Sequence, residues 1–167
     1  MVDDATSQVL YAQFEEGETT LGVFRALATV VEDYGIPVNL YTDRASWAFE
    51  TPVAGGPVDK TNLTRVGEAM KRLGVEHIPS YSPQARGRSE RVNRTFQDRL
   101  VNELDTAGIV TMEEANRYLE EIYLKDHNTR FSVAPRDPEG AFVPAKGLDA
   151  RTLFYEEEDR TVRKDNT

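Results

Sequence analysis

The sequence lacks cysteine and has no long apolar run. Without cysteine the chain can form neither disulfides nor thiolate metal sites, and a reducing cytoplasm is the simplest location. No segment approaches the roughly 20 apolar residues that span a bilayer. The polar residues 1–8 do not resemble a signal peptide. We therefore expect a cytoplasmic protein without a membrane partner.

Positive charge is also scarce. The 167 residues include 20 lysines and arginines against 29 aspartates and glutamates, which gives a net charge of -9. A protein that coats nucleic acid with its whole surface needs an excess of basic side chains, because non-specific binding rests on neutralising phosphates. Proteins of that class are therefore disfavoured. A local basic patch on an otherwise acidic protein is still possible. The hydrophobic share of 39% is ordinary for one globular domain with a core.

Strand-like and helix-like patterns alternate along the chain. Strands are predicted at residues 7–14, 37–43 and 75–83, and amphipathic helices from Thr19 or Thr20 to about Gly35, over residues 63–73, and from about Gly87 through Leu104. This order is typical of an α/β domain with a mostly parallel sheet, in which ligands gather at the carboxyl ends of the strands.

Capping residues mark several helix boundaries. Thr61 or Asn62 is expected to begin the second helix, and Gly74 is expected to close it. Thr111 and Glu114 form a capping-box pattern that opens a further helix, because each side chain can satisfy a free backbone donor of the other residue.

Two carboxylates fall at neighbouring strand ends. Asp43 ends the second predicted strand, and Glu90 lies just beyond the third, where a helix opens. Carboxylates brought together in this way are a minimal hard-oxygen site for Mg²⁺ or Mn²⁺, which points to phosphoryl transfer. Taken singly, Asp43 is more typical of a polar turn, and Glu90 of a first-turn acid favoured by the helix dipole.

The densest basic stretch of the chain surrounds Glu90. Five arginines lie between Tyr81 and Leu100. Arginines at this place would hold a polyanionic substrate where the metal acts. The alternative for each arginine, taken alone, is an ordinary solvated surface charge.

Together these regions resemble the DDE core of retroviral integrases and bacterial insertion-sequence transposases, a ribonuclease-H-like domain. LYTDRASWAF (residues 40–49) and HIPSYSPQARGRSERVNRTFQDRL (77–100) are similar to its second and third acidic segments. HNTRFSVAPRDPEGAF (127–142) is similar to the segment that follows the core in insertion-sequence transposases. The family's Pro-Gln turn, Gly-x-x-Glu and following Asn match Pro83, Gln84, Gly87, Glu90 and Asn93.

The resemblance implies a set of site residues and partners. Asp43 and Glu90 would be catalytic and would bind Mg²⁺ or Mn²⁺ for DNA cleavage and strand transfer during DNA integration. The DNA-binding residues would be Arg86, Arg88, Arg91, Asn93 and Arg94. The implied partners are transposon ends and target DNA, together with a second copy of the chain or a full-length transposase. In a bacterial cell the protein would be cytoplasmic, and nucleoid-associated when it is on DNA.

The first of the family's three catalytic aspartates has no counterpart in this resemblance. It belongs to a strand ahead of the segment matched by residues 2–10, and Asp3 and Asp4 resemble later acids instead. We therefore expect an incomplete ribonuclease-H-like fold, without the first strand and most of the second, that has unpaired strand edges. The expected units are a partial core at 1–109, a helix with a Pro-rich extension at 110–145, and the start of a truncated region at 146–167.

Three functional interpretations stay open. The first is a truncated transposase core that has little or no strand-transfer activity as an isolated chain. The second is a non-catalytic fragment that binds DNA or pairs with full-length transposase, and the third is a decaying gene product without a selected role. His77 and His127 are interpreted as polar packing residues, and Trp47 as a loop aromatic that closes over the core.

Overall fold

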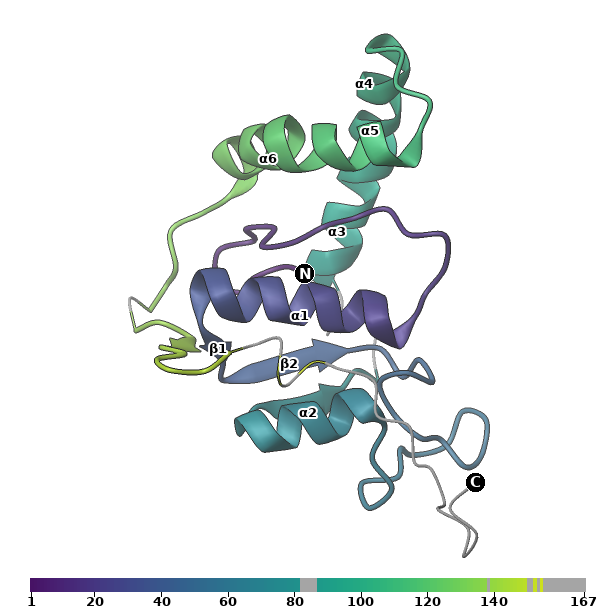
Figure 1. Cartoon of the computed structure of the whole chain (residues 1–167), viewed down its shortest axis with the longest axis vertical. Helices are drawn as coiled ribbons and strands as arrows, with labels where there is room; N and C mark the ends of the chain where they lie inside the picture. Colours follow the sequence, from purple (N-terminus) through teal and green to yellow (C-terminus); the bar gives the residue numbers. More distant parts are fainter. Residues whose placement is uncertain (82–86, 138, 150–151, 153, 155–167) are drawn as a thin grey trace, which may run out of the picture.

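The computed structural model describes residues 1–81, 87–137, 139–149, 152 and 154, and it has two parts, a body and an arm (Figure 1). The body contains α1 (Thr20–Tyr34), β1 (Ile36–Pro37), β2 (Asn39–Thr42), α2 (Arg65–Leu73), β3 (Glu76–Pro79) and β4 (Phe142–Val143). The arm contains α3 (Gly87–Thr95), the π-helical segment η2 (Phe96–Leu100), α4 (Val101–Thr106), α5 (Met112–Tyr118), the π-helical segment η3 (Leu119–Tyr123) and α6 (Leu124–Phe131). No helix among these residues is long and apolar enough to cross a bilayer.

The strands of the body form two short sheets. β2 and β3 pair in parallel, with Asn39 opposite Glu76 and Thr42 opposite Pro79, as the order of predicted elements requires. β1 and β4 pair in antiparallel fashion. Helices combined with these small sheets agree with the predicted α/β class, and within the described residues β2–β3 is the parallel part.

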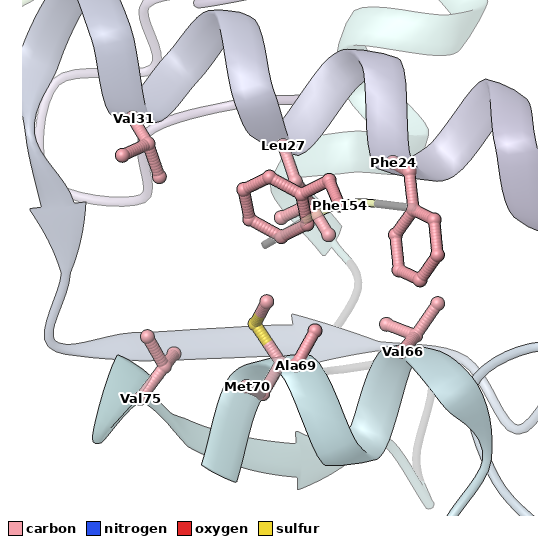
Figure 2. Packing of buried hydrophobic residues seen from close by; sticks show 8 residues of the cluster. All are labelled: Phe24, Leu27, Val31, Val66, Ala69, Met70, Val75 and Phe154. Atoms are coloured by element: carbon pink, nitrogen blue, oxygen red, sulfur yellow. The ribbon is translucent and has the colours of Figure 1, made fainter. Parts of the chain in front are cut away.

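The core of the body lies between α1 and α2. Phe24, Leu27 and Val31 share one face of α1, because they recur at intervals of three and four residues. They pack against Val66, Ala69 and Met70 of α2, with Val75 and Phe154 completing the cluster (Figure 2). Trp47 packs against the margin of this cluster, as its predicted role requires. Removal of this apolar surface from water stabilises the body by about 25 cal/mol per Å².

Side-chain caps decide where the helices of the body begin. Thr19 Oγ1 accepts a backbone hydrogen bond at 3.0 Å and begins α1, as predicted. The predicted start of α2 is wrong, because Thr64 is the cap, with its Oγ1 accepting a backbone hydrogen bond at 3.1 Å. Asp59 Oδ1 accepts from the backbone N–H groups of Thr61 and Asn62 at 2.7 and 3.1 Å, which holds both residues in a turn ahead of the helix.

The predicted strand at residues 7–14 is also wrong. Within the described residues, the segment makes one isolated antiparallel bridge, at Val9. The segment was expected to have an unpaired edge, and side-chain amides of the arm bond to its backbone instead. Asn128 accepts from Val9 N at 2.8 Å and donates to Val9 O at 2.9 Å, and Asn116 makes the same pair of bonds to Phe14 at 2.7 and 3.0 Å. The backbone polar groups at these positions are thus satisfied without a sheet.

The arm consists of two helical stretches joined by residues 107–111 (Figure 1). Its apolar centre is Leu100, Leu119 and Tyr123. The predicted stripe of the first stretch faces inward: Val92 and Leu100 are buried, and Phe96 and Leu104 are half-buried. η2 interrupts the α-helix within this stripe.

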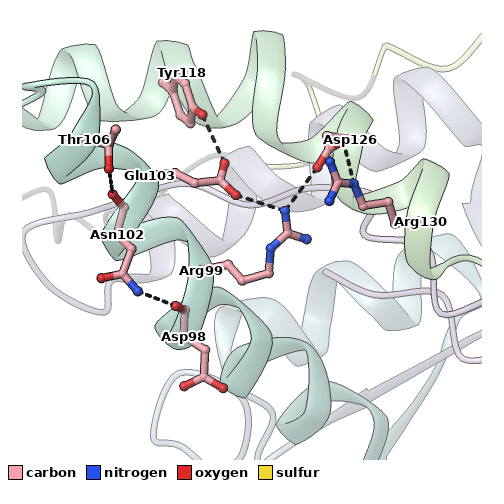
Figure 3. A network of polar contacts seen from close by, with 8 residues as sticks. All are labelled: Asp98, Arg99, Asn102, Glu103, Thr106, Tyr118, Asp126 and Arg130. Atoms are coloured by element: carbon pink, nitrogen blue, oxygen red, sulfur yellow. Dashed lines mark hydrogen bonds and ion pairs between the residues drawn. The ribbon is translucent and has the colours of Figure 1, made fainter.

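A polar network joins the two helices of the arm (Figure 3). Arg99 Nη2 donates to Glu103 Oε1 at 2.9 Å and to Asp126 Oδ2 at 3.3 Å. Glu103 also accepts from the Tyr118 hydroxyl at 3.0 Å, and Arg130 Nε donates to Asp126 at 2.8 Å. Charge-assisted bonds of this kind are stronger than neutral ones, so the network fixes how the second helix sits on the first.

His127 lies in the same interface and is 2% exposed. Its ring packs against Phe96, Tyr123 and Phe131, in agreement with the predicted packing role. In the part of the chain that the structure describes, neither ring nitrogen has a hydrogen-bond partner. Burial, and after it the charge of Arg99, lowers the pKa of His127 below its ordinary 6.5, so the ring is neutral at pH 7.

α5 begins at the predicted cap. Thr111 Oγ1 accepts from Glu114 N at 3.3 Å and donates to Glu114 Oε2 at 2.8 Å. The carboxylate therefore meets the cap hydroxyl, whereas the capping-box pattern predicts a bond to the cap backbone N–H.

Candidate functional site

A hollow of about 750 Å³ opens at the carboxyl end of β2. Its walls come from the end of this strand, the N-terminal segment and the first two turns of α3. Tyr41 and Asp43 line it from the strand side, and Arg91 and Asn93 line it from α3. Ligands of α/β sheets gather at the carboxyl ends of parallel strands, which makes this hollow the candidate site.

Asp43 is half-buried directly after β2. Its Oδ1 accepts from Ala45 N at 3.3 Å, and its backbone oxygen accepts from Thr42 Oγ1 at 3.0 Å. Because the Thr42 proton is used there, His77 Nε2 carries the proton in its 2.9 Å contact with Thr42 Oγ1. Burial lowers the pKa of His77 to about 4, so the neutral ring stacks on Phe49 with 4.1 Å between ring centroids. These contacts fix the strand end that carries Asp43.

α3 presents most of the other predicted residues. Arg91 and Asn93 are exposed and line the hollow with Asp43. Glu90 and Arg94 are exposed as well and lie one turn apart on α3, but neither is a lining residue. The structure thus brings two of the predicted DNA contacts to Asp43 and leaves Glu90 on the adjoining helix surface.

Two predicted DNA contacts lie partly or wholly outside the described residues. Arg88 belongs to α3, but its side chain is outside the description. Arg86 falls in residues 82–86, together with Pro83 and Gln84, which are also outside it. The roles of these residues stay predictions.

Asp43 and Glu90 supply the kind of oxygen donor that Mg²⁺ prefers. Across residues 1–81 and 87–137 and the other described positions, no group of three or more acidic or histidine side chains is arranged to hold a metal ion. One or two carboxylates, completed by waters and substrate phosphates, are the usual protein ligands of Mg²⁺. The donor type of the two side chains therefore suits a divalent ion, while the structure leaves Glu90 outside the lining that contains Asp43.

The charge of the hollow differs from that of the helix surface beside it. Among the lining residues that the structure describes, Asp4, Glu18 and Asp43 are acidic and Arg91 is basic. Arg94 adds a second positive charge on the exposed side of α3. A phosphate is therefore repelled from the interior unless a cation is bound there, and attracted to the α3 rim.

Sequence reasoning missed Tyr41 and the two clamping asparagines. Tyr41 lies two residues before Asp43, and residues two apart in a strand share a face, so the strand period was the available signal. Asn116 and Asn128 gave no local signal, because their backbone partners lie 102 and 119 residues away in the chain.

The chain is similar to transposases over about four fifths of its length. It is 33% identical over 136 residues to a protein of Sinorhizobium fredii (strain NBRC 101917 / NGR234) with the provisional name transposase y4bF, a match that covers 80% of this chain and 29% of that protein. It is 33% identical over 130 residues to the transposase for insertion sequence IS1202 of Streptococcus pneumoniae, covering 78% of this chain and 28% of that protein. The chain thus spans less than a third of the length of these curated relatives.

Two further comparisons gave no match. No protein-family model matches the chain, and no solved structure matches it significantly. The relatives therefore support the predicted link to transposases, while the DDE core and the ribonuclease-H-like fold stay predictions.

Proposed function

We propose that the chain is part of a ribonuclease-H-like DDE core, a unit that in DNA transposition cleaves and joins phosphodiester bonds with a divalent metal ion. With two of the three acids of such a core, the isolated chain has little or no strand-transfer activity. The observation that carries this proposal is the hollow at the end of β2, where Asp43 lies with Arg91 and Asn93. The similarity to two transposases supports the same assignment.

Each predicted residue has a role in this proposal. Asp43 and Glu90 hold Mg²⁺ or Mn²⁺, which when bound stabilises the attacking and leaving oxygens of the phosphodiester. Arg91 and Arg94 bind phosphates along the exposed side of α3, and Asn93 orients the DNA at the hollow. Arg86 and Arg88 extend the phosphate-binding surface. The substrates are transposon ends and target DNA, and a second copy or a full-length transposase is the protein partner.

Titration of the purified chain with short duplex DNA tests the phosphate-binding surface. We expect Arg91→Ala to weaken binding about 5- to 10-fold at physiological salt and to lower the slope of log K against log salt by about 0.9, because one phosphate contact is lost. The matched control is Arg117→Ala, which removes an exposed arginine of α5 that pairs with Glu113 at 3.3 Å. Equal affinities for the two variants would contradict the proposed surface.

Binding of Mn²⁺, followed by electron paramagnetic resonance with DNA present, tests the metal role. We expect Asp43→Asn and Glu90→Gln each to weaken Mn²⁺ binding at least tenfold, because each removes an anionic oxygen donor. Asp33→Asn, which neutralises an exposed acid of α1, should leave it unchanged. Mn²⁺ affinity that is the same in all three variants would contradict the metal site.

The second candidate function is metal-independent DNA binding without catalysis. The position of Glu90 favours it, since this residue is exposed and does not line the hollow with Asp43. It predicts that DNA affinity survives both Asp43→Asn and removal of divalent metal by a chelator. DNA affinity that depends on metal and on both acids would instead favour the catalytic assignment.

A further inference from the structure

Tyr41 is an exposed aromatic residue without a structural partner. It is 58% exposed, and in the described part of the chain it has no hydrogen bond and no contact with another ring or a cation. The other tyrosines that the structure describes each have such a partner: Tyr11 bonds Gln13, Tyr34 packs on Phe142, Tyr81 meets Arg44, Tyr118 bonds Glu103, and Tyr123 packs on Phe96. A single exposed ring is ordinary on a protein surface, and Tyr41 is a candidate for binding because it also lines the hollow.

The strand geometry places Tyr41 beside the candidate site. It lies two residues before Asp43, so the two side chains leave β2 on the same side. Both line the 750 Å³ hollow, whose size is within the range of sites that enclose small ligands. Within the described residues β2 has one neighbouring strand, β3, so no second strand covers its other edge there.

The charges of the hollow select what can lie on this ring. Where no cation is bound, the carboxylates of the hollow disfavour a phosphate, and with or without a cation they do not oppose an uncharged base. Every nucleobase has a flat face that stacks on an aromatic ring. Asn93 adds an amide that both donates and accepts hydrogen bonds, which suits the edge of a base. Arg91 at the rim can hold the adjoining phosphate.

We propose that Tyr41 stacks on an unpaired nucleobase, so that the hollow receives single-stranded nucleotides at a DNA end. This inference rests on the proposed function, because it requires DNA at the α3 rim. A base within a duplex is covered on both faces by its neighbours, so only an unpaired or extruded base can use the ring. The site therefore prefers DNA with a single-stranded end over the same duplex with a blunt end.

The test compares two probes on the full chain: a blunt duplex, and the same duplex with a short overhang that contains 2-aminopurine. We expect Tyr41→Ala to weaken binding of the overhang probe about 5- to 100-fold, as loss of one base-stacking platform does, and to abolish quenching of 2-aminopurine. Binding of the blunt duplex should not change. Tyr41→Phe should retain both properties, because the ring and not the hydroxyl stacks.

Controls separate this inference from the proposed function. Phe14→Ala removes another exposed ring, one that does not line the hollow, and should affect neither probe. Arg91→Ala should weaken both probes equally. If Arg91→Ala weakens both while Tyr41→Ala has no selective effect, the stacking role is wrong and the proposed function stands. If the chain binds neither probe, both are wrong.

A different occupant of the Tyr41 surface would also be visible. Sedimentation of wild type and Tyr41→Ala reports whether the open edge of β2 pairs with a second copy. A change in oligomeric state without loss of 2-aminopurine quenching would overturn the stacking role and assign Tyr41 to a contact between chains. The thermal midpoint of Tyr41→Ala should equal that of wild type, because the side chain is exposed.

Discussion

The body and the arm are held together by different chemistry. In the body, the cluster between α1 and α2 is apolar throughout, and Leu27 within it is 1% exposed. The arm has a smaller apolar centre around Leu100 and Leu119, and Arg99 joins its two helices through carboxylates. His127 is buried in the same interface. The body therefore depends on filled volume, and the arm on polar groups that must be paired or stay neutral.

Truncation of the body core should give the largest effect. We expect Leu27→Ala to lower the free energy of unfolding by about 3–5 kcal/mol, because it removes apolar contacts and leaves a cavity between α1 and α2. Trp47, the single tryptophan, packs against this cluster, so its fluorescence during urea unfolding reports the change. Leu21→Ala, at an exposed position of α1, is the matched control and should cost about 0.5 kcal/mol or less. Equal losses of unfolding free energy in the two variants would contradict the conclusion that the stability of the body depends on a filled core.

The two asparagine clamps give the next effect. Asn128→Ala should destabilise the chain by about 2–3 kcal/mol, because it leaves the N–H and C=O of Val9 without partners at a position that is 3% exposed. Asn116→Ala removes the same pair of bonds, but at the exposed Phe14, where water can replace them. It should cost about 0.5 kcal/mol. Urea unfolding followed by circular dichroism measures both, and equal losses would show that burial does not set the value of the clamp.

His127→Leu should stabilise the arm. The substitution removes two buried nitrogens that have no partner among the described residues, so we expect a gain of about 1–2 kcal/mol in the opening free energy of α6, measured by amide hydrogen exchange. In this variant the stability of α6 should also no longer decrease with falling pH through His127. Burial is the main cause that lowers the pKa of His127 in the fold; the charge of Arg99 lowers it further, and the charge of Asp126 partly opposes both. The unfolded chain therefore takes up the proton first as the pH falls below 6.5.

The sign of this pH effect is therefore fixed. The stability that neutral His127 contributes is present above pH 6.5 and is lost as the pH falls toward its lowered value in the fold. Burial lowers the pKa of His77 as well, to about 4. The body of the His127→Leu variant therefore still loses stability as the pH falls. Exchange in α6 that stays as acid-sensitive in His127→Leu as in wild type would contradict the assignment to His127.

Local patterns predicted what local forces determine. The stripe of Phe24, Leu27 and Val31 and the cap at Thr19 specify α1 within its own residues, and the predicted helix is confirmed. The strand prediction for residues 7–14 was wrong because the hydrogen-bond partners of this segment are side chains of Asn116 and Asn128, more than a hundred residues away in the chain. The predicted cap of α2 was wrong because Asp59, upstream of the helix, accepts hydrogen bonds from Thr61 and Asn62 and holds both residues in a turn.

The candidate site was predictable to the same extent. The place of Asp43 directly after a parallel strand is confirmed by the pairing of β2 with β3, and its catalytic role stays a prediction. The distance between Glu90 and Asp43 does not follow from the pattern, because it depends on how α3 leaves the body, and the structure keeps Glu90 outside the lining of the hollow. Tyr41 was missed because a tyrosine in a strand pattern is interpreted as a strand former, although its spacing of two residues from Asp43 already placed both on one face.

The smallest expected effect comes from the cap of α5. We expect Thr111→Ala to destabilise the arm by about 1 kcal/mol, because Glu114 N loses its acceptor in the first turn. Thr111→Ser should keep most of this stability. Thr106→Ala, which removes a hydroxyl that bonds Asn102 O and caps nothing, should change it by only a few tenths of a kcal/mol. Amide exchange in α5 measures all three variants, while Trp47 fluorescence follows the body. If Thr111→Ala shifts the Trp47 transition as much as exchange in α5, the two parts unfold as one cooperative unit, and their different chemistry does not make them separately stable.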